Sequence, residues 1–330
     1  MNKSGPIDGV IVCSAGEKSG LGHYKRSKKI IRILQNNQEF KLDFVVIGDN
    51  QLSNFDQEFT PFFVDSVEEL NKIPCLIKKQ ISLVIFDLNL GLIGNNIKVL
   101  FNNLKKRGIK LISIDGFDQY ENILDLIYVP SFFNKKEEKE ISKKICYGWD
   151  SYLLDIEKKN YKYQTGKKIL VLTGGSDTKK LNERLPMILA NKIPKEYEIH
   201  WVIGPFASDF EVQKEQNVIK HYSPKNLQEI MKKSNYAITP YGVSFFELLY
   251  LGIPTVVFSP YEERQVEKEL VLIEEKLISS VAKNEEEIVI GLLRLIKDEK
   301  LAERLSSKSQ KLMEHSNGKK LLSAVRKLFN

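Results

Sequence analysis

Apolar and polar positions alternate in blocks along the whole chain, and the block 236–258 shows the pattern most clearly. Its apolar start, 236–239, predicts a strand that a proline and a glycine end. A helix is expected from 243 or 244 to Gly252, since a residue without Cβ can adopt the left-handed cap conformation. The apolar run 255–258 then predicts a second buried strand.

This strand-helix-strand unit directs a helix N-terminus out of the carboxyl edge of a parallel sheet. Free N–H groups and partial positive charge at that point suit a diphosphate. Glu247 lies one turn into the helix, where its carboxylate can accept hydrogen bonds from a ribose diol. The alternative is that Glu247 only interacts favourably with the helix dipole.

The first half of the chain begins with a strand at 8–15, followed by a loop that carries three glycines. A helix is expected from about His23, with an apolar face that includes Ile30 and Leu34. The histidine therefore stands at the carboxyl edge of the first strand. A functional base and a satisfied helix-start residue are both consistent with this position, and the edge location favours the base.

Further strands are expected at 43–47, 83–87, 110–115 and 124–129, with helices between them. Asp87 and Asp115 each close one of these strands, so both carboxylates are expected at the same sheet edge. The first half therefore reads as an alternating α/β domain.

A segment without apolar periodicity, about 158–167, predicts a linker between a first domain at 1–157 and a second at 168–330. The second domain restarts with a strand at 168–173 and a turn formed by Gly174, Gly175, Ser176 and Asp177. The glycines let the backbone approach a ligand closely, and Ser176 and Asp177 suit a helix N-cap. A plain strand-to-helix turn with a cap is the alternative.

The remaining pattern predicts strands at 198–204, 218–222 and 278–281. A helix is expected at 225–233, and 285–328 is expected to be helical with polar breaks. The basic residues near the end of the chain (Lys319, Lys320, Arg326 and Lys327) read as a solvated face, with membrane docking as the minority interpretation.

The composition adds four bounds. At 330 residues the chain is long for one core, which favours two domains. Fifty basic against 43 acidic residues give a net charge of +7, scattered along the chain, which favours anionic ligands and leaves room for membrane-surface contact. No interleaving of aromatic and basic residues suggests a nucleic-acid partner. Three unpaired cysteines, no apolar run of transmembrane length and no signal-peptide pattern lead us to expect a cytoplasmic protein without a transmembrane segment.

Three motifs carry a family resemblance. The stretches 22–26, 174–177 and 242–247, the last followed by 252–254 and Gln265, resemble those of the nucleotide-sugar hydrolases of pseudaminic acid biosynthesis. The segment 147–154 is similar to the one that precedes the linker in that family, so the likeness runs along nearly the whole chain. The resemblance implies an α/β fold of two Rossmann-like domains facing across a cleft, the glycosyltransferase-B fold.

The resemblance also implies an activity. Those enzymes hydrolyse a UDP-linked diacetamido-trideoxyhexose to the free sugar and UDP without a metal, and no Asp-x-Asp pair for a cation occurs in this sequence. His23 matches the base that activates water. We expect no cofactor and a monomer. The residues expected to bind the UDP-sugar are Gly22, Arg26, Asp87, Asn89, Gly174, Gly175, Ser176, Asp177, Tyr241, Gly242, Val243, Ser244, Glu247 and Gln265.

The sequence departs from the family at several positions. Leu21 stands where a glycine usually precedes Gly22, and Asn89 stands where a tyrosine of the sugar pocket is expected. The sugar therefore stays open. Two further functions stay open as well: a glycosyltransferase with an acceptor hydroxyl in place of water, and a nucleotide-sugar-binding protein without turnover. Dehydrogenases are disfavoured, because neither half carries the dinucleotide fingerprint.

Overall fold

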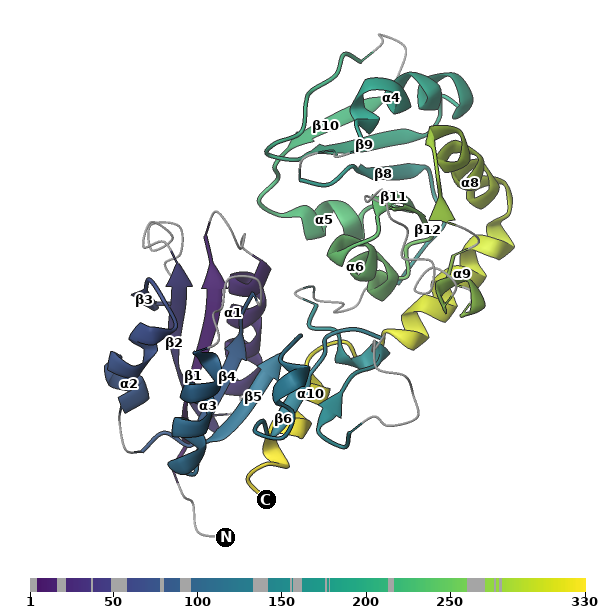
Figure 1. Cartoon of the computed structure of the whole chain (residues 1–330). Helices are drawn as coiled ribbons and strands as arrows, with labels where there is room; N and C mark the ends of the chain where they lie inside the picture. Colours follow the sequence, from purple (N-terminus) through teal and green to yellow (C-terminus); the bar gives the residue numbers. More distant parts are fainter. Residues whose placement is uncertain are drawn as a thin grey trace. The chain divides into compact units, whose positions relative to one another are not determined.

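A computed structural model describes the chain in fifteen stretches: 5–16, 22–36, 38–48, 58–77, 80–89, 96–132, 142–154, 156, 162–175, 177, 179–212, 217–259, 271–275, 277–278 and 281–330. It forms two compact units. The first comprises Met1–Asp155 with His315–Asn330, and the second comprises Ile156–Glu314. Each unit is an α/β body with one parallel sheet (Figure 1).

The sheet of the first unit has seven strands within the described residues, in the order β3-β2-β1-β4-β5-β6-β7, and every pairing is parallel. The strands are β1 (Ile7–Ala15), β2 (Phe40–Gly48), β3 (Phe62–Val64), β4 (Leu83–Asp87), β5 (Lys110–Ile114), β6 (Leu126–Tyr128) and β7 (Ile145–Cys146). The helices are α1 (Gly22–Gln35), α2 (Pro74–Ile77), α3 (Ile97–Lys106) and α10 (Lys319–Arg326), with short 3-10 turns η2 (Glu68–Lys72), η4 (Asp118–Tyr120) and η6 (Trp149–Ser151).

Helices cover both faces of this sheet, because its strands are apolar on both sides. On one face α2 and α3 bury Leu76, Leu100 and Phe101 against strand residues such as Phe86. On the other face α1 and α10 bury their apolar stripes, which include Ile30 and Leu321. The sheet is thereby held rigidly between two layers, and its carboxyl edge remains for function.

The sheet of the second unit has six strands within the described residues, in the order β10-β9-β8-β11-β12-β13, again all parallel. The strands are β8 (Lys168–Leu172), β9 (Glu198–Ile203), β10 (Val218–Tyr222), β11 (Tyr236–Pro240), β12 (Thr255–Phe258) and β13 (Val281–Ala282). The helices are α4 (Leu181–Lys192), α5 (Leu227–Lys232), α6 (Val243–Leu251), α8 (Glu285–Lys297) and α9 (Glu299–Leu312).

The core of the second unit forms where α4, α8 and α9 pack on strand residues that include the fully buried Trp201. The helix α6 ends as its sequence predicts: Gly252 is left-handed, with φ 76°, and a Cβ there would come within 2.4 Å of Gln310. Position 252 therefore requires glycine for its conformation and for space.

The last helix corrects the expected domain division. The second domain was expected to run to residue 330, but His315–Asn330 belong to the first unit. The physical reason is the apolar stripe of α10, since Leu321, Leu322 and Val325 complete the core beneath α1 and β6. Gly318 has a φ of 83°, and a Cβ at this position would lie only 2.3 Å from Cδ1 of Ile33.

The basic residues of this helix are correspondingly less free than expected. Lys320 donates to the carbonyl oxygen of Tyr147 at 2.7 Å and pairs with Asp150 at 2.6 Å, and Arg326 pairs with Glu39. Two of the four cations therefore anchor the helix to the first unit. The structural boundary between Asp155 and Ile156 lies close to the expected end at 157, and 162–167 of the expected linker belong to the second unit.

Within the described residues, none of the helices has the length and apolarity needed to cross a membrane. Cys13, Cys75 and Cys146 are free thiols, as their spacing predicted. The strands β4, β10 and β12 have the expected bounds, whereas β3 and β7 were not expected.

Candidate functional site

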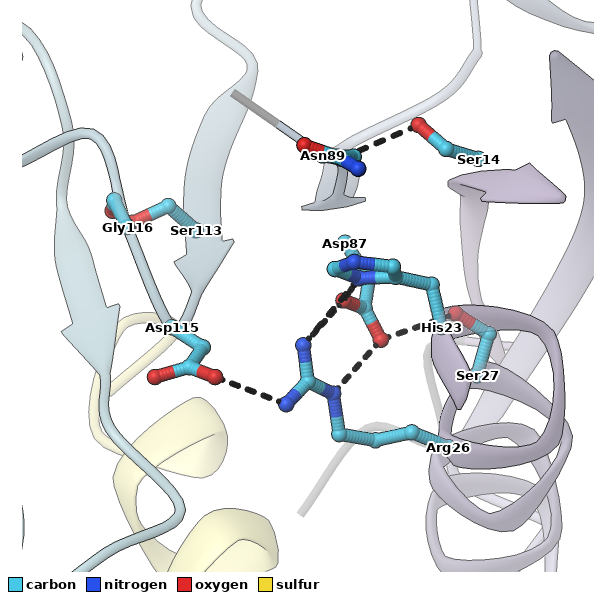
Figure 2. A network of polar contacts seen from close by, with 9 residues as sticks. All are labelled: Ser14, His23, Arg26, Ser27, Asp87, Asn89, Ser113, Asp115 and Gly116. Atoms are coloured by element: carbon cyan, nitrogen blue, oxygen red, sulfur yellow. Dashed lines mark hydrogen bonds and ion pairs between the residues drawn. The ribbon is translucent and has the colours of Figure 1, made fainter. Parts of the chain in front are cut away.

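The polar site of the first unit lies where the strand order changes direction. β1 has β2 on one side and β4 on the other, and α1 follows β1 in the chain. Ligands bind in this class of sheet at such a switch point, outside the carboxyl ends of the strands. The start of α1 and the ends of β4 and β5 bring His23, Arg26, Asp87 and Asp115 together there (Figure 2).

The imidazole of His23 is paired with a buried carboxylate. Its Nδ1 lies 2.7 Å from Oδ1 of Asp87. Because an ionised carboxylate can only accept, we assign the hydrogen to Nδ1, and the lone pair of the neutral ring is then on Nε2. The His23 side chain is 22% exposed and that of Asp87 is fully buried. This arrangement fixes the tautomer of a partly accessible base.

Arg26 ties the site together from one turn further along α1. Its Nε and Nη2 donate to the two oxygens of Asp87 at 2.9 and 2.6 Å, and Nη1 donates to Oδ2 of Asp115 at 2.9 Å. Burial alone would lower the pKa of Arg26, but the two carboxylates raise that pKa above its usual value. The guanidinium is thus a fixed cross-link between β4 and β5, and each of its nitrogens is engaged with protein groups.

Asp87 has no hydrogen-bonding capacity left for a ligand. Its Oδ1 accepts hydrogen bonds from Nδ1 of His23 and Nη2 of Arg26. Its Oδ2 accepts from Nε of Arg26 and, at 3.3 Å, from the hydroxyl of Ser27. Burial would raise the pKa of this carboxyl, but the charge and hydrogen bonds of Arg26, aided by His23, hold the pKa below its usual range. Asp87 therefore orients the site, and its expected direct contact with substrate is not favoured by this geometry.

Asp115 stands on a tight turn at the end of β5. Both Asp115 (φ 60°) and Phe117 (φ 68°) adopt the left-handed conformation, and the Ser113 hydroxyl donates to the Gly116 carbonyl at 2.7 Å to hold the turn. Such conformations cost free energy and persist only where the surroundings enforce them. Asp115 is about half exposed, so one carboxylate oxygen lies at the open edge.

Asn89 lies just beyond β4 and is half buried. Its backbone N–H donates to the Ser14 hydroxyl at 3.1 Å, which fixes the exit of β4 against the end of β1 (Figure 2). Gly22 is the exposed first residue of α1, and a Cβ there would meet no atom within 4 Å. Both residues thus border the site. Ser14, Ser27 and Asp115 belong to its hydrogen-bond network but not to the expected set.

The second unit has a switch point of its own, between β8 and β11. The turn after β8 carries Gly174, with φ 94°, and Gly175, and both are exposed. Gly204, after β9, lies against this turn so closely that a Cβ would come within 2.4 Å of the Gly174 carbonyl oxygen. The absence of a side chain at Gly204 therefore lets the loop after β9 contact the backbone of the Gly174–Gly175 turn.

Asp177 is a buried helix cap. Its two carboxylate oxygens accept from the backbone N–H groups of Leu181 and Asn182 at 2.9 and 2.8 Å, at the start of α4. Asp177 therefore stabilises the start of the helix, as the alternative interpretation of the turn expects. The N-cap position itself is occupied by Lys180, because α4 begins only at Leu181. Both oxygens already accept hydrogen bonds and the residue is only 6% exposed, so this geometry does not favour a hydrogen bond from Asp177 to a ligand.

The N-terminus of α6 carries no side-chain cap. Gly242 precedes it in an extended conformation with open space around it, and Val243 is 71% exposed. Tyr241 and Ser244 are half buried on either side of this start, and Glu247 is half buried one turn further on, on the same helix face as Val243. The start of α6 thus presents uncapped backbone N–H groups with a carboxylate nearby.

Two expected site residues, Ser176 and Gln265, lie outside the described residues. In the part of the chain that the structure describes, no cluster of three histidine, cysteine, aspartate or glutamate side chains has the geometry of a metal site.

No protein-family model matches the chain. An uncharacterized protein of Methanocaldococcus jannaschii, MJ1062, is 26% identical over 273 residues, which cover 75% of this chain and 54% of that protein. The chain therefore spans about half the length of this relative.

Solved structures resemble the whole chain. MurG of Acinetobacter baumannii has a TM-score of 0.65 at 15% identity, covering 98% of this chain and 100% of that one. The UDP-GlcNAc 2-epimerase of Neisseria meningitidis, solved bound to UDP-GlcNAc, has a TM-score of 0.66 at 14% identity. The match covers 97% of this chain and 100% of the epimerase chain. The Staphylococcus aureus MnaA–UDP structure has a TM-score of 0.61 at 13% identity, and the match covers 98% of this chain and 97% of the MnaA chain. With the two parallel sheets, these likenesses define the class: a protein of two Rossmann-like domains with the glycosyltransferase-B fold.

Proposed function

We propose that this protein hydrolyses a UDP-linked amino sugar to the free sugar and UDP. The observation that carries the proposal is the His23–Asp87 pair, 2.7 Å long, at the carboxyl edge of the first sheet. A histidine whose tautomer is fixed by a buried carboxylate is a common form of general base, and it is the group that such a hydrolysis requires.

In the proposed reaction, Nε2 of His23 takes a proton from water while the water oxygen attacks the anomeric carbon. The bond between that carbon and the diphosphate oxygen breaks, and its electron pair leaves with UDP. Asp87 stabilises the imidazolium that forms, because its charge is held close to Nδ1. The Arg26 cross-link keeps Asp87 ionised and in place throughout.

The second unit is proposed to hold UDP. The uncapped start of α6 offers N–H groups to the diphosphate, the exposed Gly174 and Gly175 let it approach the β8 turn, and Glu247 accepts from the ribose diol. Structures of this fold solved with UDP and with UDP-GlcNAc support the choice of ligand class.

The proposed sugar is a diacetamido-trideoxyhexose, and the proposed process is the synthesis of nonulosonic acids for bacterial surface glycans. Support comes from the motifs around His23, Gly174 and Glu247, which resemble those of the pseudaminic acid hydrolases.

A glycosyltransferase is the second candidate. Structures of the same fold include CalG4, a calicheamicin glycosyltransferase, which supports this candidate. The His23–Asp87 pair can deprotonate an acceptor hydroxyl as readily as water. The base alone does not distinguish the two reactions.

The deciding experiment incubates the protein with a panel of UDP-amino sugars, without acceptor, and follows UDP and free sugar by mass spectrometry. A hydrolase releases both in equal amounts well above background, and a His23→Gln variant loses this release. UDP release only after addition of a lipid or glycan acceptor would establish the transferase. Release of neither, with or without acceptor, would contradict both enzymatic proposals.

A further inference from the structure

The most exposed large apolar side chains in the described part of the chain share one location. Phe206 is 83% exposed and Val243 is 71% exposed, more than any other such residue there. Phe206 stands in the loop after β9, and Val243 is the first residue of α6 after β11. In the sheet, β8 lies between these two strands. Single exposed apolar residues are ordinary, so the location of this pair is the informative point.

The backbone of Phe206 is fixed to the paired-glycine turn. Its N–H donates to the Gly175 carbonyl at 2.9 Å, and Ala207 closes a turn back to Gly204 at 3.2 Å. Gly204 has no room for a Cβ against the carbonyl oxygens of Gly174 and Gly175. The ring of Phe206 is therefore presented to solvent by a rigid backbone.

The two neighbouring loops leave open space at their glycines. A Cβ at Gly175 or at Gly242 would meet no atom within 4 Å. Neighbouring strands lie about 4.8 Å apart, so the ends of β9 and β11 are roughly 10 Å apart across β8. A nucleoside whose diphosphate lies at the start of α6 is long enough to reach the loop after β9.

We propose that Phe206 is the stacking platform for the nucleobase of the bound nucleotide. The inference rests on the proposed function, in which the second unit holds UDP, and it assigns one further residue to that site. Stacking of a base on an aromatic ring in protein–nucleic acid complexes is worth roughly 5- to 150-fold in affinity. Because every base has an aromatic face, this contact strengthens binding without selecting uracil.

The test is calorimetry of wild type, Phe206→Ala and Phe206→Tyr with two probes, UDP and inorganic diphosphate. Phe206→Ala is expected to bind UDP roughly 5- to 150-fold more weakly and diphosphate as tightly as wild type, because diphosphate has no base. Phe206→Tyr is expected to restore UDP binding. The matched control is Ile290→Ala, which removes a 66% exposed apolar side chain from α8 and should change neither affinity.

A Phe206→Trp variant supplies a readout independent of affinity. Its indole should be quenched saturably by UDP and remain unquenched by diphosphate. Equal UDP affinity of wild type and Phe206→Ala would overturn the stacking role while leaving the proposed function intact. An equal loss for both probes would also overturn it, because that pattern indicates a disturbed loop. Failure of wild type to bind UDP would overturn the proposed function, and the inference with it.

Discussion

Nδ1 of His23 and Oδ1 of Asp87 lie 2.7 Å apart, although the two residues are 64 positions apart in the sequence. Nη2 of Arg26 approaches both atoms, at 3.2 Å from the nitrogen and 2.6 Å from the oxygen. Since Nδ1 carries the hydrogen that Asp87 accepts, the contact between Arg26 and His23 is proximity without a hydrogen bond. His23 and Arg26 thus share the buried carboxylate of Asp87, and replacing His23 should have a different effect from replacing Asp87.

Replacing His23 by Gln should lower turnover roughly 10²- to 10⁴-fold, because the general base is lost. UDP affinity should stay unchanged, since the proposed UDP contacts belong to the other unit. Steady-state kinetics and calorimetry measure the two quantities. His315→Gln is the matched control, as His315 is exposed and belongs to the same unit. Normal turnover of His23→Gln would remove His23 from the mechanism.

Replacing Asp87 by Asn should destabilise the first unit by about 3 kcal/mol at neutral pH, because a partly buried guanidinium loses its closest counter-charge. The pKa of Asp87 is lowered in the folded protein, so its contribution is complete above the unfolded value, about 3.9. That contribution is lost as the pH falls through the lower folded value.

Unfolding measured between pH 2 and 7 should therefore show the gap between wild type and Asp87→Asn shrinking toward acid. The exposed Asp65 offers a matched control, because Asp65→Asn makes the same chemical change in the same unit. A gap that stayed constant down to pH 2 would mean that the charge of Asp87 does not stabilise the fold.

Replacing Glu247 by Ala should weaken UDP binding by up to two charge-assisted hydrogen bonds, roughly 1.5–3 kcal/mol each. Glu286→Ala, an exposed carboxylate in the first turn of α8, serves as the control and should leave UDP affinity unchanged. Calorimetry with UDP decides the point. Equal affinities of Glu247→Ala and wild type would leave this carboxylate with a role in helix stability alone.

Replacing Asp177 by Ala should lower the free energy of unfolding of the second unit by about 0.5–2 kcal/mol, as for other lost helix caps. UDP affinity should persist, because both oxygens of Asp177 already serve α4. Asn284, whose side chain caps α8 by accepting from Glu287 N–H at 2.9 Å, provides a matched cap for comparison. A large loss of UDP affinity without destabilisation would return Asp177 to the ligand-binding set.

Much of this architecture can be predicted from the sequence. Apolar runs with clear polar borders predicted the bounds of β4 and β12, and the same kind of border placed Asp87 and Asp115 at one edge. The bounds of β10 were also predicted correctly, although that strand contains a lysine and a histidine. His23 and Arg26 are three positions apart on a helix, so their shared face also follows from spacing. The strands β3 and β7 have only three and two residues, and apolar runs this short do not predict a strand.

The roles of individual polar groups were harder to predict. Sequence spacing cannot tell whether Arg26 binds an anionic substrate or two aspartates, because that depends on the adjacency of β4 and β5 in space. Similarly, the Gly-Gly-Ser-Asp turn fits both a ligand loop and a capped helix start, and only the hydrogen bonds of Asp177 show the cap. Phe206 gave no signal, since exposure is not visible in a sequence.

The return of α10 to the first unit has a consequence for how the protein is made. A ribosome completes the contiguous second unit, 156–314, before Leu321, Leu322 and Val325 emerge. Until then, the apolar surface that these residues cover on the first unit is open to water and to other chains. Of the two units, the one that is synthesised first is therefore the last to be completed, and its uncovered apolar surface is a site for aggregation during that interval.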